Sequence, residues 1–257
     1  MLQSARSRGH RVAVFLVTVL ALVLAPVLAP MRQAWAKAAT PIPDPQRIEV
    51  PGYPDAFYYR PRVRGMRPVI MYLHGRGGNP MEECRKWAKV ATQFGWVVCP
   101  QGPVDKGGGA RAWDNNAIVG GQIADATVKA LRAKYKRRVQ LHGNVLIGFS
   151  EGAFVAMQVA IHDTRTWSRW LILAANDQYW WGDAPGLLDD NRKKVRIYLF
   201  TGETDAVVEN TKRVGDMLKA HKMRYKMKIA TGMGHEVPAD RMVTNYRRPL
   251  SWLLATK

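Results

Sequence analysis

Acidic residues and cysteines are both scarce in this sequence of 257 residues. It has 20 Asp and Glu against 39 Lys and Arg, which gives a formal net charge of +19, and it has two cysteines. It also has no internal repeat and no low-complexity block, which excludes repeat architectures and a largely disordered chain. Hydrophobic residues make up 47% of the chain. That is enough for one large core, and α/β domains of this size are often single.

The first 36 residues contain no acidic residue and no cysteine. Three arginines precede an apolar run from Val12 to Ala25, and Ala34-Trp35-Ala36 follows as a small-x-small site. These three parts are typical of a secretory signal peptide, so we expect export, secreted or periplasmic, with cleavage after Ala36, Ala38 or Ala39. The alternative is a membrane anchor, but the run is shorter than the roughly 20 residues of a span unless it is extended to Ala29. The missing cysteine argues against a lipid anchor.

The chain therefore divides into a signal peptide at 1–36, a Pro-rich leader at 37–45 and a folded domain at 46–257. Four basic residues and no acidic residue lie in the first 36, so the remainder carries +15. A charge of this size favours loose association with anionic envelope surfaces. No recognised nucleic-acid module surrounds the basic clusters at 134–138 and 192–194, so we expect no specific nucleic-acid binding. We also expect no stable membrane span after processing, because cleavage removes the apolar run.

Apolar strands and helices alternate along the folded domain. Strands are expected at 46–50, 56–60, 68–73, 96–99, 144–149, 170–175, 195–201 and 225–230. Helices are expected at 81–94, 120–135, 153–161 and 208–221, with a last helix that ends at Leu254 and is interrupted near Pro249. The pattern predicts an α/β fold with a mostly parallel eight-stranded sheet flanked by helices, whose ligand site lies at the carboxyl ends of the strands.

Four loops with glycine follow four of these strands, and each supplies a different chemical group. They are His74-Gly75-Arg76-Gly77-Gly78, Gly148-Phe149-Ser150-Glu151-Gly152, Thr201-Gly202-Glu203-Thr204-Asp205 and Gly232-Met233-Gly234-His235. A serine hydroxyl needs a base to become a nucleophile, and a carboxylate orients that base. We therefore predict Ser150 as nucleophile, His235 as base and Asp205 as the orienting acid.

Each of these assignments has an alternative. Ser150 could be a small residue in a tight turn, and His235 a surface loop histidine. Glu203 and Asp177 compete with Asp205 for the role of the acid. For the oxyanion site, the sequence predicts the backbone N–H groups of Glu151, which begins the next helix, and of Arg76.

The motifs resemble those of the α/β-hydrolase superfamily, in particular its secreted esterase, polyhydroxyalkanoate depolymerase and dienelactone-hydrolase-like branches. Gly148-Phe149-Ser150-Glu151-Gly152 resembles the nucleophile elbow, and 74–78 resembles the oxyanion loop, although Arg76 stands at a glycine position of the lipase-type HGGG pattern. The resemblance implies the fold and a triad of Ser150, His235 and Asp205, and it does not specify the substrate. Together with the predicted signal peptide, it leads us to expect an exported serine hydrolase that cleaves a small or polymeric carboxylic ester through an acyl-enzyme, with no metal and no cofactor. Alternatives are a secreted serine peptidase and a non-catalytic module that binds anionic envelope polymer.

An aromatic segment after the strand at 170–175 is placed where such proteins carry cap elements. Only about 20 residues separate this strand from the next, so the cap segment is expected to be small. Four aromatic residues are candidates for the substrate pocket, with core packing as the alternative: Trp113, Tyr179, Trp180 and Trp181.

The two cysteines, Cys84 and Cys99, lie near the start of a helix and at the end of the next strand. These points share one edge of the sheet, so a disulfide is sterically reasonable in an oxidising compartment, while two buried free thiols are the alternative.

Overall fold

The computed structural model describes residues 42–255 except 181 and 183. The predicted signal peptide lies outside the described residues, as does the leader up to residue 41. The end of the leader is ordered, because the Tyr59 hydroxyl donates to the Pro43 carbonyl over 2.6 Å and Arg85 pairs with Asp44. Among the described residues, no helix combines the length and the hydropathy needed to cross a bilayer.

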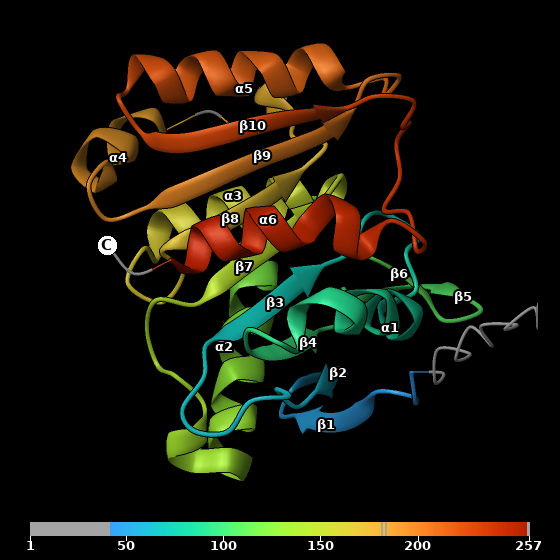
Figure 1. The fold of residues 1–257 in the computed structure, drawn as a ribbon. Helices are drawn as coiled ribbons and strands as arrows, with labels where there is room; N and C mark the ends of the chain where they lie inside the picture. Colours follow the sequence, from blue (N-terminus) through green and yellow to red (C-terminus); the bar gives the residue numbers. More distant parts are fainter. Residues whose placement is uncertain (1–41, 181, 183, 256–257) are drawn as a thin grey trace, which may run out of the picture. The chain divides into compact units, whose positions relative to one another are not determined.

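One eight-stranded sheet forms the centre of the fold, in the order β1-β2-β4-β3-β7-β8-β9-β10 (Figure 1). β1 and β2 pair antiparallel, β2 pairs antiparallel with β4, and the remaining neighbours are parallel. The strands are β1 (Gln46–Val50), β2 (Tyr53–Tyr59), β3 (Val69–Leu73), β4 (Trp96–Cys99), β7 (Val145–Phe149), β8 (Arg169–Leu173), β9 (Arg196–Gly202) and β10 (Arg224–Ala230). The predicted α/β sheet is confirmed.

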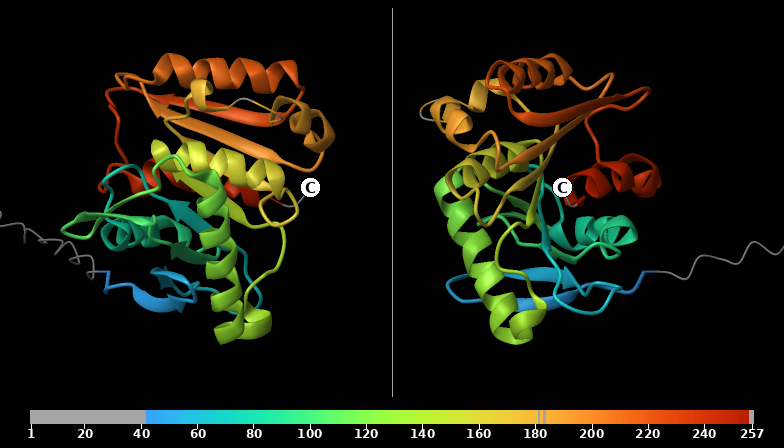
Figure 2. Two further views of the ribbon diagram at one scale, coloured as in Figure 1. Left: turned by 180° about the vertical axis from the view of Figure 1, so that it is seen from behind. Right: turned by 60° about the vertical axis from the view of Figure 1, so that its left-hand side comes forward.

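Helices cover both faces of the sheet, as the largely apolar central strands β3, β4, β7 and β8 require (Figure 2). α1 (Pro80–Ala91) and α6 (Met242–Leu254) pack on one face. α2 (Ala117–Tyr135), α3 (Glu151–His162) and α5 (Val208–Ala220) pack on the other. Alternate residues of each strand enter the two cores, so that Ile147 faces α1 and α6 while Leu146 faces α2 and α3.

Three elements differ from the sequence-based expectation. The segment at 101–116, where the sequence predicted no strand, contains a hairpin of β5 (Val104–Gly107) and β6 (Ala110–Ala112). A further helix, α4 (Ala184–Asn191), lies between β8 and β9. Helix α6 continues through Pro249 without interruption. Proline removes one helical hydrogen bond, but Tyr246, Pro249 and Leu253 are all buried, and their packing holds the helix together.

The corner between β7 and α3 depends on two glycines. A Cβ atom on Gly148 would lie 2.2 Å from the Gly152 carbonyl oxygen, and one on Gly152 would lie 2.2 Å from the Leu73 carbonyl oxygen. Real Cβ atoms do not approach so closely, so the strand, the helix and β3 can meet here only because both side chains are absent.

We predict that Gly148→Ala lowers the free energy of unfolding by about 3 kcal/mol or more, because the new methyl group overlaps backbone that cannot move freely. The matched control is Gly186→Ala in α4, where a Cβ atom has nothing within 4 Å. Alanine is the better helix former, so this change should stabilise by up to about 1 kcal/mol. Urea unfolding of both variants measures the effects, and an equal response at the two positions would contradict the packing argument.

Candidate active site

The four glycine loops lie at one edge of the sheet, beyond the carboxyl ends of their strands (Figure 1). Arg76 follows β3, Ser150 follows β7, Asp205 follows β9 and His235 follows β10. In strand order β3, β7, β9 and β10 are separated only by β8, so parallel pairing brings the four loops to neighbouring positions. This is the edge at which open α/β sheets bind ligands.

Ser150, His235 and Asp205 form a continuous chain of hydrogen bonds. The Ser150 Oγ atom lies 2.9 Å from His235 Nε2. His235 Nδ1 lies 3.0 Å from Asp205 Oδ1 and 3.1 Å from Oδ2. The Phe149 ring packs on the imidazole with 4.8 Å between ring centroids. The structure therefore brings together the three residues that the sequence predicts, in an arrangement that lets a carboxylate orient an imidazole toward a hydroxyl.

Asp205 is buried and its carboxylate is held by two further donors. The Val207 N–H donates to Oδ1 over 2.9 Å, and the Thr201 hydroxyl donates to Oδ2 over 3.1 Å. The two rival acids are engaged elsewhere. Asp177 pairs with Arg213 on α5 over 2.8 Å, and this hydrogen bond lowers its pKa. Glu203 is exposed and accepts from the Gly232 N–H.

Ser150 occupies a strained backbone conformation at the start of α3. Its φ of 55° and ψ of −119° lie outside the regions that non-glycine residues ordinarily adopt. Such a turn projects the serine hydroxyl away from the strand and helix that flank it. Glu151, the first helical residue, has a backbone N–H without a carbonyl partner inside the helix.

The loop at 74–78 lies directly against Ser150. A Cβ atom on Gly75 would be 3.4 Å from Ser150 Cβ, so the two backbones are close neighbours. Two hydrogen bonds with β6 clamp the loop: Gly77 N–H donates to the Arg111 carbonyl over 2.8 Å, and Arg111 N–H donates to that of Gly78 over 2.9 Å. Arg76 lines the same cavity as Ser150 and Glu151. The predicted pair of backbone donors is thus placed on two elements that flank the serine.

The side chain of Glu151 has a structural role that the sequence did not reveal. Its buried carboxylate pairs with the Arg76 guanidinium over 2.6 Å and accepts from the backbone N–H groups of Trp113, over 2.9 Å, and Asn115, over 3.2 Å. It therefore ties the loop after β3 and the loop after β6 to the start of α3. Asp114 and Asn115 both have positive φ, 54° and 51°, and Glu151 holds this unfavourable turn beside the site.

His74 shapes the loop through hydrogen bonds of its ring. It is fully buried, and its Nε2 accepts from the Gly102 N–H over 3.0 Å. Nδ1 must then carry the proton, which it donates to the Gly75 carbonyl over 2.8 Å. Burial lowers the pKa of His74 from 6.5 to about 4, so this imidazole is neutral near pH 7.

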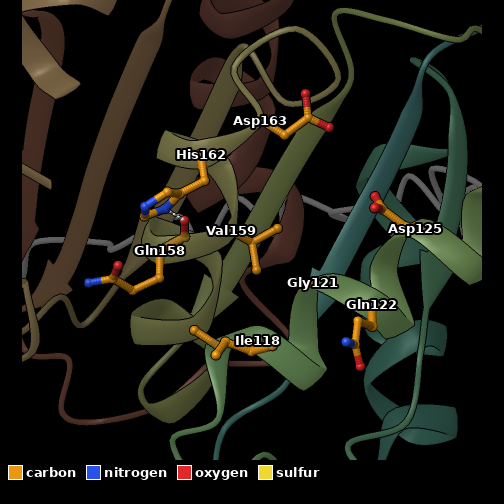
Figure 3. Close-up of a pocket in the computed structure, with 9 residues that line it drawn as sticks. Ile118, Gly121, Gln122, Asp125, Gln158, Val159, His162 and Asp163 are labelled. Atoms are coloured by element: carbon orange, nitrogen blue, oxygen red, sulfur yellow. Dashed lines mark hydrogen bonds between the residues drawn. The ribbon is translucent and has the colours of Figure 1, made fainter. Parts of the chain in front are cut away.

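A cavity of about 210 Å³ opens at Ser150 and His235, and continues outward as a groove. Its other lining residues include Asn115, Phe154 and Asn176. Asn115 and Phe154 also line a neighbouring cavity of about 450 Å³, which shares Ile118 and Gln158 with a third cavity of about 350 Å³ between α2 and α3. Figure 3 shows this third cavity, with Ile118 of α2 facing Gln158 and Val159 of α3. It contains none of the reactive side chains, so we assign the chemistry to the smaller cavity.

Known structures show the same architecture. No protein-family model matches the sequence, and no curated protein matches it. The carboxylesterase of Bacillus cereus matches with a TM-score of 0.56 and 15% identity, over 77% of this chain and 92% of that one. FphF of Staphylococcus aureus, a fluorophosphonate-binding serine hydrolase, matches with a TM-score of 0.59 and 14% identity, over 82% and 97%.

An uncharacterized protein from Bacillus cereus ATCC 10987 matches with a TM-score of 0.61 and 18% identity, over 74% of this chain. The chain spans 61% of the length of that protein. These likenesses agree with the mostly parallel eight-stranded sheet flanked by helices. The chain has the α/β-hydrolase fold.

Two of the predicted pocket aromatics belong to the core of this α/β-hydrolase fold, so that prediction was wrong for them. Trp113 is fully buried, its indole N–H donates to the His74 carbonyl over 2.9 Å, and its ring stacks on His74. Trp180 is buried against Trp170. The side chain of Tyr179 and all of Trp181 lie outside the described residues. Residues such as Asn115, Phe154 and Asn176 line the cavity instead. No sequence pattern marks them as lining residues.

Cys84 and Cys99 are buried free thiols in the α/β-hydrolase fold, so the disulfide is not formed in the structure. They belong to the core beneath α1 and α6. Burial raises the pKa of the Cys99 thiol, and a hydrogen bond with Cys84 adds to the effect. Cys99 is therefore a neutral thiol at neutral pH, and both side chains pack in the apolar core.

His74 generates a prediction for the pH dependence of stability. At a pH above 6.5 neither the folded nor the unfolded chain protonates this ring, and between pH 6.5 and about 4 only the unfolded chain does. The stability that the neutral ring contributes is therefore complete above pH 6.5 and is lost as the pH falls to about 4, in total about 3 kcal/mol. His74→Gln should flatten this part of the profile.

Urea unfolding between pH 7 and pH 4 measures how steeply the free energy of unfolding changes with pH. This slope does not depend on the overall loss of stability in the variant. Titration of the imidazole resonances by NMR provides the direct check, and the resonance that disappears in His74→Gln identifies the ring. A native ring that titrates at its ordinary pKa, or an unchanged slope in the variant, would contradict the assignment.

Proposed function

We propose that this protein is an exported serine hydrolase that cleaves a carboxylic ester. The observation that carries the proposal is the unbroken hydrogen-bond chain from Ser150 through His235 to Asp205, at distances of 2.9 and 3.0 Å. If Ser150 were only a small residue in a tight turn, we would not expect an imidazole and a buried carboxylate to be aligned with its hydroxyl. Export rests on the amino-terminal sequence alone.

In the first half of the reaction, Ser150 Oγ attacks the acyl carbon and His235 Nε2 takes its proton. The carbonyl oxygen becomes an oxyanion, which the N–H groups of Arg76 and Glu151 stabilise. The bond to the alcohol oxygen then breaks, and His235 returns the proton to the leaving alcohol. The products of this half are a free alcohol and an ester of Ser150. Asp205 keeps its charge and stabilises the imidazolium.

In the second half, water replaces the alcohol. His235 takes a proton from water, the hydroxide attacks the acyl carbon, and the proton returns to Ser150 Oγ as the acid leaves. Atoms and charges balance without a metal or an organic cofactor. The imidazole is 41% exposed, so water reaches it without the movement of a lid.

The size of the site favours a compact acyl group. The cavity at Ser150 has a volume of about 210 Å³, which is below the usual range of ligand-binding pockets. The groove that continues over Ile118 and Gln158 leaves room for a longer group on one side of the scissile bond. Both a small ester and an ester within a polymer fit this arrangement.

We predict that Ser150→Ala abolishes labelling by a fluorophosphonate probe and lowers kcat on short p-nitrophenyl esters by about 10⁴ or more. The matched control is Ser251→Ala, at an exposed position of α6, which should keep full activity. Labelling that persists in Ser150→Ala would place the nucleophile elsewhere. A panel of acyl chain lengths, with acetyl and feruloyl esters included, then defines the acyl group.

The orienting acid gives a second prediction, because the loop after β9 carries two carboxylates. Asp205→Asn removes the charge that stabilises the imidazolium and should lower kcat by about 10³–10⁴. Glu203→Gln makes the same chemical change two residues away, at an exposed side chain, and should leave kcat nearly unchanged. Steady-state kinetics of both variants shows which carboxylate orients His235. A larger loss of kcat in Glu203→Gln than in Asp205→Asn would reverse the assignment.

A further inference from the structure

A face of one charge sign lies at the edge of the sheet opposite to the candidate active site. Its nine members, called the basic face below, are Arg60, Arg62, Arg64, Arg67, Arg132, Lys134, Lys136, Arg137 and Arg138. They come from the loop before β3 and from the end of α2 with the turn that follows it, before β7. Both segments lie at the amino ends of parallel strands, whereas Ser150 lies beyond the carboxyl ends (Figure 1).

The two segments are held side by side by specific contacts. Arg67 N–H donates to the Arg138 carbonyl over 3.0 Å, and Gln140 N–H donates to that of Arg67 over 2.8 Å. The Arg60 guanidinium donates to the Tyr135 hydroxyl over 3.1 Å and lies 5.0 Å from the centre of its ring. The charges of both segments therefore form one surface.

The two segments that carry this surface contain no carboxylate, although Asp125 and Asp163 line a cavity with Arg132, and Glu49 lines a groove with Lys134. The sequence has no Asp or Glu between Asp55 and Glu82, and none between Asp125 and Glu151. Seven of the nine side chains are exposed, and none of the nine forms an ion pair with a described residue. Arginines elsewhere, such as Arg76, Arg111 and Arg213, do have carboxylate partners. Unopposed like charges destabilise a fold, so this face calls for an anionic partner.

Apolar side chains stand among these charges. Met66, between Arg64 and Arg67, is 63% exposed, and Leu141, three residues after Arg138, is 47% exposed. Beside the face, Lys134 lines a groove of about 720 Å³ between β1 and α2. Three alanines of α2 and Ile48 make up much of its apolar wall.

We propose that the basic face binds the surface of a bilayer that contains anionic phospholipids. Phosphate headgroups would neutralise the guanidinium and ammonium groups, and Met66 and Leu141 would enter the interface between headgroups and acyl chains. A soluble polyanion would satisfy the charges but would leave the two apolar side chains in water. The bound protein would present the cavity at Ser150 away from the bilayer, toward a substrate that is not a membrane lipid.

Vesicle sedimentation of the purified protein tests this, with phosphatidylcholine vesicles and with vesicles that contain equal parts of phosphatidylcholine and phosphatidylglycerol. Binding should require phosphatidylglycerol and should weaken between about 0.1 M and about 1 M salt, because the screening length falls from about 10 Å to about 3 Å. Every variant keeps the same first 41 residues, so any binding through that segment cancels in the comparison.

Removal of three charges gives the main variant. The combined change Arg64→Gln, Lys136→Gln and Arg137→Gln should lower the partition coefficient on anionic vesicles about 100-fold, from the usual gain per basic residue near a charged bilayer. The matched control, Lys106→Gln with Arg247→Gln and Arg248→Gln, removes the same charge from exposed positions on the β5–β6 hairpin and α6. It should bind within a few-fold of the native protein. An equal loss in the two triple variants would overturn the proposal.

A second pair of changes separates a bilayer from a soluble polyanion. Met66→Ser with Leu141→Ser should weaken binding to anionic vesicles but leave the salt concentration of elution from immobilised heparin unchanged. Binding to vesicles that does not depend on phosphatidylglycerol, or apolar changes that have no effect on vesicle binding, would overturn the proposal. In the latter case retention on heparin would indicate a surface for anionic polymer.

Discussion

The corner between β7 and α3 is the constraint on which the candidate site depends. Gly148 and Gly152 allow the strand, the helix and β3 to approach within distances that any side chain would prevent. Ser150 then takes a φ that a serine ordinarily avoids, and α3 begins with the next residue, Glu151, whose N–H has no carbonyl partner inside the helix. The buried Glu151 carboxylate completes the corner, since it joins α3 to the loops that hold Arg76 and Asn115.

The sequence predicted the parts of this arrangement that depend on local pattern. Apolar runs separated by amphipathic helices were sufficient for the sheet, and glycine loops after the strands were sufficient to bring Ser150, Asp205 and His235 together. The role of the Glu151 side chain could not be predicted, because its partners, the Arg76 guanidinium and two backbone N–H groups, lie far away in the sequence. Trp113 was misplaced for a related reason: whether an aromatic residue lines a cavity or fills the core depends on packing that has no periodic signal. Pro249 shows the same limit, since burial of α6 overrides a local helix breaker.

The charges of the molecule differ between the carboxyl ends and the amino ends of the parallel strands. Carboxylates gather beyond the carboxyl ends of the strands, where Glu151, Asp177 and Asp205 each hold a loop or a catalytic candidate in position. The amino ends carry the basic face, which has no carboxylates in either of its segments. A net charge summed over the chain conceals this division. By position, nine of the positive charges lie together on the basic face.

The buried position of Cys84 and Cys99 has a consequence for how the protein matures. Both side chains are completely shielded from solvent in the core beneath α1 and α6, with the two thiols in contact. An oxidant cannot reach a pair that is enclosed in this way, and a thiol whose pKa is raised reacts slowly. The order of events therefore decides the outcome: closure of the core before oxidation preserves two thiols, and only a chain that meets an oxidant while still open can acquire the bridge.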